Sequence, residues 1–213
     1  MQNNYISIIF EYVPITVALL LVCIGMLRFK TLTRELRVLF LFSILAFASD
    51  LCSLILGKYG INNLFVFHVF TPAEFILLSA VYYFKSEKKG VKIALIIVSI
   101  LFLILAFVDS FFFELLSSVD SISSATESLV LMLYSLFFFY SLLKKLEYKN
   151  LFDNPMFWFN SGVLIYFSGN FFLFIFSNYM LGFSDVYFDR MWHIHDILNV
   201  AMNILFGLAL WKR

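Results

Sequence analysis

The sequence predicts an all-α membrane protein, in which a single domain forms a bundle of seven transmembrane helices. Three observations lead to this prediction. First, 62% of the 213 residues are hydrophobic and only 14% are charged, whereas a soluble domain is about half apolar and about a quarter charged. Second, seven apolar stretches reach the roughly 20 residues that a membrane span needs. Third, basic residues are concentrated in every second connection between these stretches.

The seven predicted spans follow one another with short connections. In chain order they are Tyr5–Leu27, Val38–Leu56, Leu64–Phe84, Ile93–Phe112, Ser124–Leu143, Met156–Tyr179 and Met191–Trp211. They are continuous apolar runs and too long for the alternating strands of a membrane barrel. No basic residue precedes the first span and no small-residue cleavage site follows it, so we expect it to stay in the mature protein. We expect one domain over residues 1–213.

Charge predicts the orientation of these spans. Thirteen of the 15 Lys and Arg residues lie at the C-terminus or in the links after the first, third and fifth spans. The remaining links hold only Lys58 and Arg190. The positive-inside rule places the basic side in the cytoplasm. We therefore predict a multi-pass protein of the cell (inner) membrane with its N-terminus outside and its C-terminus in the cytoplasm.

Matching patterns in spans one to three and five to seven favour a parallel 3+1+3 repeat, with the fourth span as a linker. For example, Glu11 precedes Arg28 by 17 residues, as Glu127 precedes Lys144.

Two further features concern packing. Gly162 and Gly169 lie one heptad apart and predict where span six approaches a neighbouring helix closely. Cys23 and Cys52 fall near opposite faces of the membrane, too far apart for a disulfide, so we expect both to be buried free thiols.

Ionisable residues inside spans are energetically costly and are functional candidates by default. Those predicted here are Glu11, Asp50, His68, Glu74, Asp109, Glu127, His195 and Asp196. All lie at the midplane or nearer the predicted outside. Helical spacing places His195, Asn199 and Asn203 on one face of span seven. We therefore expect a pocket that opens to the outside, with these ligand-binding candidates: Asp50, Glu74, His195, Asn199, Asn170 and His68.

An alternative interpretation is that such groups only hold helices together in pairs. A second set then reaches headgroups or water and has no special role; it comprises Glu11, Asp109, Glu127, His193 and Asp196.

The topology is similar to that of SWEET-type sugar transporters, which implies a small-solute transporter as an alternative. Their Pro-Gln signature is absent, because Pro14, Pro72 and Pro155 precede other residues. Microbial rhodopsins share the topology, but retinal linkage is excluded because span seven contains no Lys before Lys212. The sequence motifs of animal seven-helix receptors are also absent.

The histidines resemble, in part, the ligand set of seven-helix zinc hydrolases of the alkaline-ceramidase type. That resemblance implies a zinc site at His68, His195 and Asp50 in a membrane-embedded lipid hydrolase. The family's late histidines are four residues apart, whereas His193 and His195 are two apart and point about 200° apart on a helix. Zinc hydrolysis therefore stays a minority hypothesis.

The final third of the chain, from Phe157 to Lys212, resembles small seven-helix bacterial integral membrane proteins, a resemblance that implies no activity. We expect a sensor or a regulatory or accessory subunit that binds a small or lipidic ligand, rather than an enzyme. Because the connections are too short to signal alone, we expect a protein partner in the membrane or cytoplasm besides the lipid bilayer. We expect no cofactor and no nucleic acid.

Overall fold

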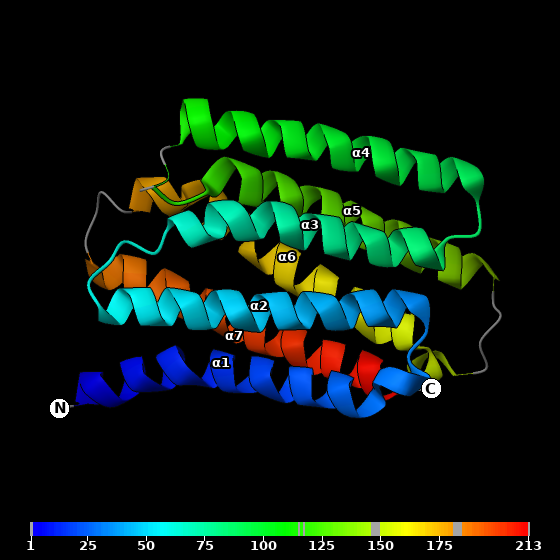
Figure 1. Ribbon diagram of the computed structural model, residues 1–213, viewed down its shortest axis with the longest axis horizontal. Coiled ribbons are helices and arrows are strands. Elements are labelled where there is room, and N and C mark those ends of the chain that lie inside the picture. Colours follow the sequence, from blue (N-terminus) through cyan, green and yellow to red (C-terminus); the bar gives the residue numbers. More distant parts are fainter. Residues whose placement is uncertain (1, 115, 117, 146–149, 181–184, 213) are drawn as a thin grey trace.

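The protein forms an all-helical bundle, seen here in a computed structural model that describes residues 2–114, 116, 118–145, 150–180 and 185–212. No strand occurs within these ranges. The seven long helices are α1 (Gln2–Arg28), α2 (Arg34–Lys58), α3 (Phe65–Lys85), α4 (Lys89–Val108), α5 (Ser121–Lys145), α6 (Pro155–Met180) and α7 (Asp185–Trp211). Each carries an apolar stretch long enough to cross a membrane, which confirms the seven predicted spans. Successive helices run in opposite directions (Figure 1).

Most of the helices extend a few residues beyond the predicted apolar spans, because backbone hydrogen bonding continues into polar sequence; α4 instead ends at Val108, where a π-helical turn follows. The start of α6 shows the local reason for such a boundary. Pro155 opens the helix, where its missing N–H is not needed. The side chain of Asn154 accepts a hydrogen bond of 3.0 Å from the backbone N–H of Met156, which caps the first turn.

Six of the helices surround the interior, and α4 lies at the edge of the bundle (Figure 1). Going around the interior, contacts join α1 to α2, α2 to α3, α3 to α5, α5 to α6, α6 to α7, and α7 back to α1. The edge helix α4 packs mainly on α3 and α5. Large apolar side chains of α4, among them Ile97, Leu101 and Phe107, are exposed, as expected of a helix that faces lipid.

The tightest part of the core lies in the half of the bundle nearer the C-terminus. Phe42, Phe159 and Phe206 are fully buried there. Phe159 stacks on Phe206 with ring centroids 5.3 Å apart, and Phe42 meets Phe206 edge-on at 5.7 Å. Such pairs add to the packing energy of the buried rings themselves. These rings close the interior toward that end of the bundle.

A buried amide joins three helices beside this aromatic core. The hydroxyl of Tyr82 on α3 donates to Oδ1 of Asn160 on α6 at 2.8 Å. The hydroxyl of Ser135 on α5 donates to the backbone carbonyl of Asn160 at 2.9 Å, and Asn160 Nδ2 donates to the Met156 carbonyl at 2.7 Å. Asn160 therefore has the helix-joining role that the alternative interpretation gives to polar residues inside spans.

The glycines of α6 lie where the predicted close approach occurs. A Cβ atom on Gly162 would lie 2.8 Å from a ring carbon of Phe206, and one on Gly169 would lie 2.6 Å from a methyl group of Leu198. Both neighbours belong to α7, so the absence of a side chain lets these two helices pack closely.

The two cysteines are both free, as predicted, but the expectation that both are buried was wrong. Cys23 is half-buried and Cys52 is exposed. Only part of the α2 surface packs against neighbouring helices, and Cys52 lies outside it.

We predict that Gly162→Ala destabilises the protein, because fully buried Phe206 has no space to move away from the new methyl group. Overpacking of this kind costs about 1–3 kcal/mol of unfolding free energy. Thermal unfolding followed by circular dichroism in detergent measures the change. Gly207→Ala is the matched control on α7, since its nearest neighbour is an ordinary contact at 3.5 Å from Ile24. Equal melting temperatures for the two variants would contradict this packing argument.

Candidate functional site

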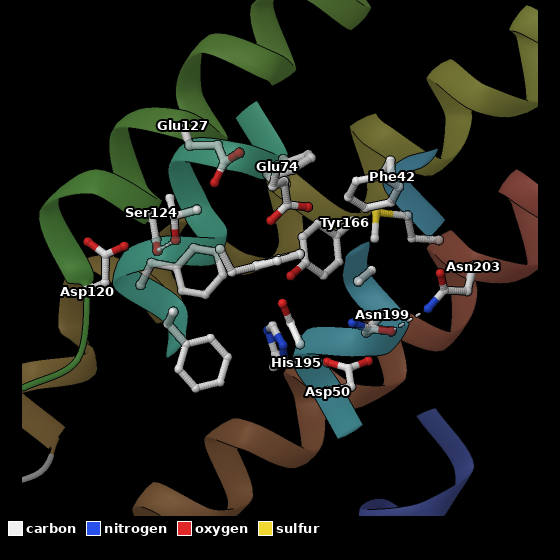
Figure 2. A pocket seen from close by; sticks show the side chains of 18 of the residues that line it. Phe42, Asp50, Glu74, Asp120, Ser124, Glu127, Tyr166, His195, Asn199 and Asn203 are labelled. Atoms are coloured by element: carbon white, nitrogen blue, oxygen red, sulfur yellow. Dashed lines mark hydrogen bonds between the residues drawn. The ribbon is translucent and has the colours of Figure 1, made fainter. Parts of the chain in front are cut away.

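A cavity of about 60 Å³ lies between α2, α3, α5, α6 and α7 (Figure 2). Most of the helix segments that line it belong to the half of the bundle nearer the N-terminus, and Phe42, Met202 and Asn203 extend the lining toward the aromatic core. Four carboxylic acids face this space: Asp50, Glu74, Asp120 and Glu127. Among the lining residues that the structure describes there is no Lys or Arg. The cavity therefore concentrates acidic groups inside a membrane-spanning bundle.

These acids reach the cavity from opposite sides. Glu74 on α3 and Glu127 on α5 enter from one side, and Asp50 on α2 enters from the other, next to His195 on α7 (Figure 2). Asp120 directly precedes α5, and Glu127 follows it by two helical turns, so both lie on the same face of that helix. Glu74 and Glu127 are almost fully buried, at 4% and 2% exposure.

Apolar and aromatic side chains form the rest of the wall. Phe42, Phe167 and Met202 line the cavity on the side of the aromatic core. Tyr166 and Trp192 add two further aromatic rings to the lining. Beyond the cavity, toward that end of the bundle, the rings of Phe42, Phe159 and Phe206 pack against one another.

A second, open groove adjoins the cavity. It has a volume of about 430 Å³ and lies between α1, α2, α3 and α7, with Glu11, Lys58 and Asp196 among its lining residues. Asp50 and Phe67 line both the groove and the cavity. The groove therefore provides a route toward the cavity, with a carboxylate and an aromatic ring where the two meet.

His195 is held in one orientation by its surroundings. Its Nδ1 lies 3.2 Å from Oδ1 of Asn170, whose Nδ2 donates to the Tyr166 carbonyl at 3.0 Å. Because that amide oxygen can only accept, His195 donates through Nδ1 and keeps Nε2 as an acceptor. Rings of Trp192 and Phe174 pack edge-on against it, with centroids 5.0 Å and 5.8 Å away.

His68 belongs to a different cluster. Its Nε2 donates to the backbone carbonyl of Ser118 at 3.2 Å, and its Nδ1 lies 3.1 Å from the hydroxyl of Ser110. These contacts tie the start of α3 to the connection between α4 and α5. His68 is almost fully buried, at 5% exposure, but it is not among the residues that line the cavity.

The structure thus brings together most of the candidates selected from the sequence. Asp50, Glu74, His195 and Asn199 line the cavity, and Asn170 contacts it through His195. His68 lies apart, so the set His68, His195 and Asp50 does not form a three-ligand group within the described ranges of the chain.

Two residues that the alternative interpretation of the sequence places at headgroups or water are instead buried. Glu127 is 2% exposed and lines the cavity, and Asp109 is 1% exposed. Asp109 Oδ2 accepts hydrogen bonds from the backbone N–H and the hydroxyl of Ser123, at 3.2 Å and 2.6 Å. Distance along a span indicates depth but not which side of the helix faces the interior, and that side decides burial here.

Sequence reasoning also missed Asp120 as a lining residue. A signal was present, since Asp120, Ser124, Glu127 and Ser128 recur at helical spacing and form a polar stripe on α5. Asp120 lies just outside the apolar stretch, where an acidic residue is usually solvated. Burial raises the pKa of Asp120 to about 6, against the weaker opposing effects of the Thr71 hydroxyl and the His68 ring.

Several acidic oxygens in the cavity lack the partners that buried polar atoms normally have. Neither carboxylate oxygen of Asp120 accepts a hydrogen bond of normal geometry, and nor does Oε1 of Glu127. More than nine-tenths of buried polar groups in proteins are hydrogen-bonded. The unpartnered acceptors therefore indicate a site that receives a hydrogen-bond donor or a positive charge.

No family model, no curated protein and no solved structure matches this chain. The functional argument therefore depends on the geometry of the cavity and on the sequence.

We predict that nitrogen-15 NMR of histidine-labelled protein shows His195 as the neutral Nδ1–H tautomer. The chain has only three histidines, so His68→Gln and His193→Gln assign the signals. Asn170→Leu removes the acceptor and should abolish the Nδ1–H signature. Asn203→Leu is the control, because Asn203 donates to Asn199 at 2.6 Å and not to the ring. An unchanged His195 signal in Asn170→Leu would show that the amide does not fix the tautomer.

Proposed function

We propose that this protein is a membrane sensor or accessory subunit that binds a small, positively charged ligand in the acid-lined cavity. The observation that carries the proposal is the set of four carboxylic acids around one cavity whose described lining contains no basic residue. Buried charge is costly unless an opposite charge accompanies it. A cationic ligand supplies that charge, and its N–H groups satisfy acceptors that the protein leaves free.

The lining favours a protonated amine. Carboxylates accept its N–H bonds, and Tyr166 and Trp192 supply aromatic rings to the same lining, which attract a cation through their ring electrons. The volume of about 60 Å³ has room for a few water molecules or for a compact amine, and not for an acyl chain. Both a free amine and the amine of a lipid headgroup have this chemistry.

The orientation predicted from charge determines from which side of the membrane a ligand reaches the cavity. With the N-terminus outside, the groove beside Asp50 lies on the outer side of the membrane, and the packed rings of Phe42, Phe159 and Phe206 lie toward the cytoplasm. The ligand then enters from outside. The peripheral position of α4 is consistent with a linker between two three-helix units, and the parallel repeat remains a prediction.

The same closure favours sensing over transport. Transporters alternate access to a site near the midplane, which here would require the aromatic core to open. A sensor needs only a change in helix packing around the bound ligand. The connections are short, so a protein partner in the membrane or cytoplasm is needed to relay that change.

We predict that ethanolamine binds the purified protein in nanodiscs and raises its melting temperature, whereas ethylene glycol, its neutral analogue, does neither. Glu74→Gln removes one charged partner of the bound amine, which costs about 1.5–3 kcal/mol of binding energy, or roughly a 10- to 100-fold loss of affinity. Calorimetric titration measures the affinity of each variant for ethanolamine. Glu87→Gln is the control, because Glu87 is exposed at the other end of the bundle.

Two further arms separate the remaining possibilities. If the natural ligand is a lipid headgroup, nanodiscs rich in phosphatidylethanolamine should compete with free ethanolamine, and phosphatidylglycerol nanodiscs should not. Uptake of labelled ethanolamine into proteoliposomes would show that the protein is a transporter and would contradict the proposed sensor role. Failure of every cationic probe to bind would contradict the proposed ligand class.

We also predict the outcome of labelling with a membrane-impermeant maleimide after Cys23 and Cys52 are replaced by Ala. Ile61→Cys, in the connection between α2 and α3, should react in intact cells. Lys88→Cys, in the connection between α3 and α4, should react only after permeabilisation. The reverse pattern would invert the orientation and place the groove on the cytoplasmic side.

A further inference from the structure

Three carboxylates gather at the end of the bundle where α4 passes into α5. The last turn of α4 widens into a π-helical turn, Asp109–Phe113, and the chain then returns to the start of α5. This return brings one oxygen each of Asp109, Glu114 and Asp120 within 4.8 Å of one another. In the described part of the chain, no ion pair with Lys or Arg involves any of them.

Helix capping explains two of these carboxylates. Glu114 Oε2 accepts from the backbone N–H groups of Ser121 and Ile122 at 2.7 Å and 3.2 Å, and Asp109 Oδ2 accepts from that of Ser123. Carboxylates are favourable at the first turn of a helix, where such N–H groups have no partner within the helix. Each of these two side chains thus has a structural role.

Capping does not explain Asp120. Its side chain is 2% exposed, and neither of its oxygens accepts a hydrogen bond of normal geometry. Asp109 Oδ1 is also buried without a partner. Three unpartnered carboxylate oxygens therefore lie beside the bonded carboxylate of Glu114, and the three acids repel one another.

We propose that Asp109, Glu114 and Asp120 bind a hard divalent cation, Ca²⁺ in the first place. Carboxylate oxygens are the preferred ligands of Ca²⁺, at 2.3–2.6 Å. Three oxygens that all lie within 4.8 Å of one another are close enough to bind one such ion together. Water completes the coordination. The set contains no thiolate or imidazole, so it disfavours zinc.

The bound cation would connect three parts of the bundle. Asp109 belongs to the end of α4, Asp120 directly precedes α5, and Glu114 accepts a hydrogen bond of 2.7 Å from Nδ2 of Asn178 on α6. Asp120 also lines the acid-lined cavity. Cation binding therefore neutralises one of the four cavity acids, in addition to fixing the connection between α4 and α5.

The test uses the full chain in detergent, stripped with a chelator and then titrated with CaCl₂. We expect a dissociation constant of about 0.1–1 mM, as for extracellular calcium modules, and a rise in melting temperature of about 5 °C near saturation. Sodium chloride of equal ionic strength should give no such rise. Calorimetric titration reports the binding directly.

Asp120→Asn should remove the calcium response and leave the calcium-free protein at least as stable, because it removes a buried acid that has no partner. Asp109→Asn is the second variant, and Asp153→Asn, in an exposed pair with Lys212, is the control that retains the response. The proposal is overturned if Ca²⁺ neither binds nor stabilises the wild type. It is also overturned if both variants keep the wild-type response, or if only Zn²⁺ stabilises the protein.

Discussion

A membrane interior offers no water to polar groups, so each acid, amide or imidazole placed there must find its partner within the protein. This constraint organises the whole bundle. Where partners are complete, as around Asn160 with Tyr82 and Ser135, polar groups hold helices together in the packed half. Around Glu127 and Asp120 some carboxylate oxygens have no partner, and there the helices enclose a cavity.

The two halves of the bundle accordingly differ in packing and in the polar groups that they bury. The half nearer the C-terminus is closed by stacked phenylalanines and by the close approach of α6 and α7 at Gly162. The other half combines acids with aromatic rings and has an adjoining open groove. A closely packed half beside a partly unsatisfied one suits a protein that responds to a ligand, because binding supplies the interactions that the open half lacks.

Both proposals depend on the same electrostatic imbalance but at different places. In the cavity, the acids lie among aromatic rings, which suits an organic cation. At the junction of α4 and α5, carboxylates lie together without aromatic faces in the group, which suits a small hard ion. Asp120 belongs to both groups, so each site affects the charge of the other.

The sequence by itself determined the helical class and the seven spans, because the length of an apolar run depends on bilayer thickness and not on neighbouring helices. It also located where α6 approaches a neighbouring helix closely, since only glycine leaves room there, and it selected Asp50, Glu74, His195 and Asn199, whose depth follows from position along a span. Tertiary structure alone decided which side of each helix faces inward. That choice buried Glu127 and Asp109, exposed Cys52 and separated His68 from His195. It also brought Asp120 in from just before the start of α5. Residue spacing shows which side chains share a face of a helix, and packing between helices decides which face is turned inward.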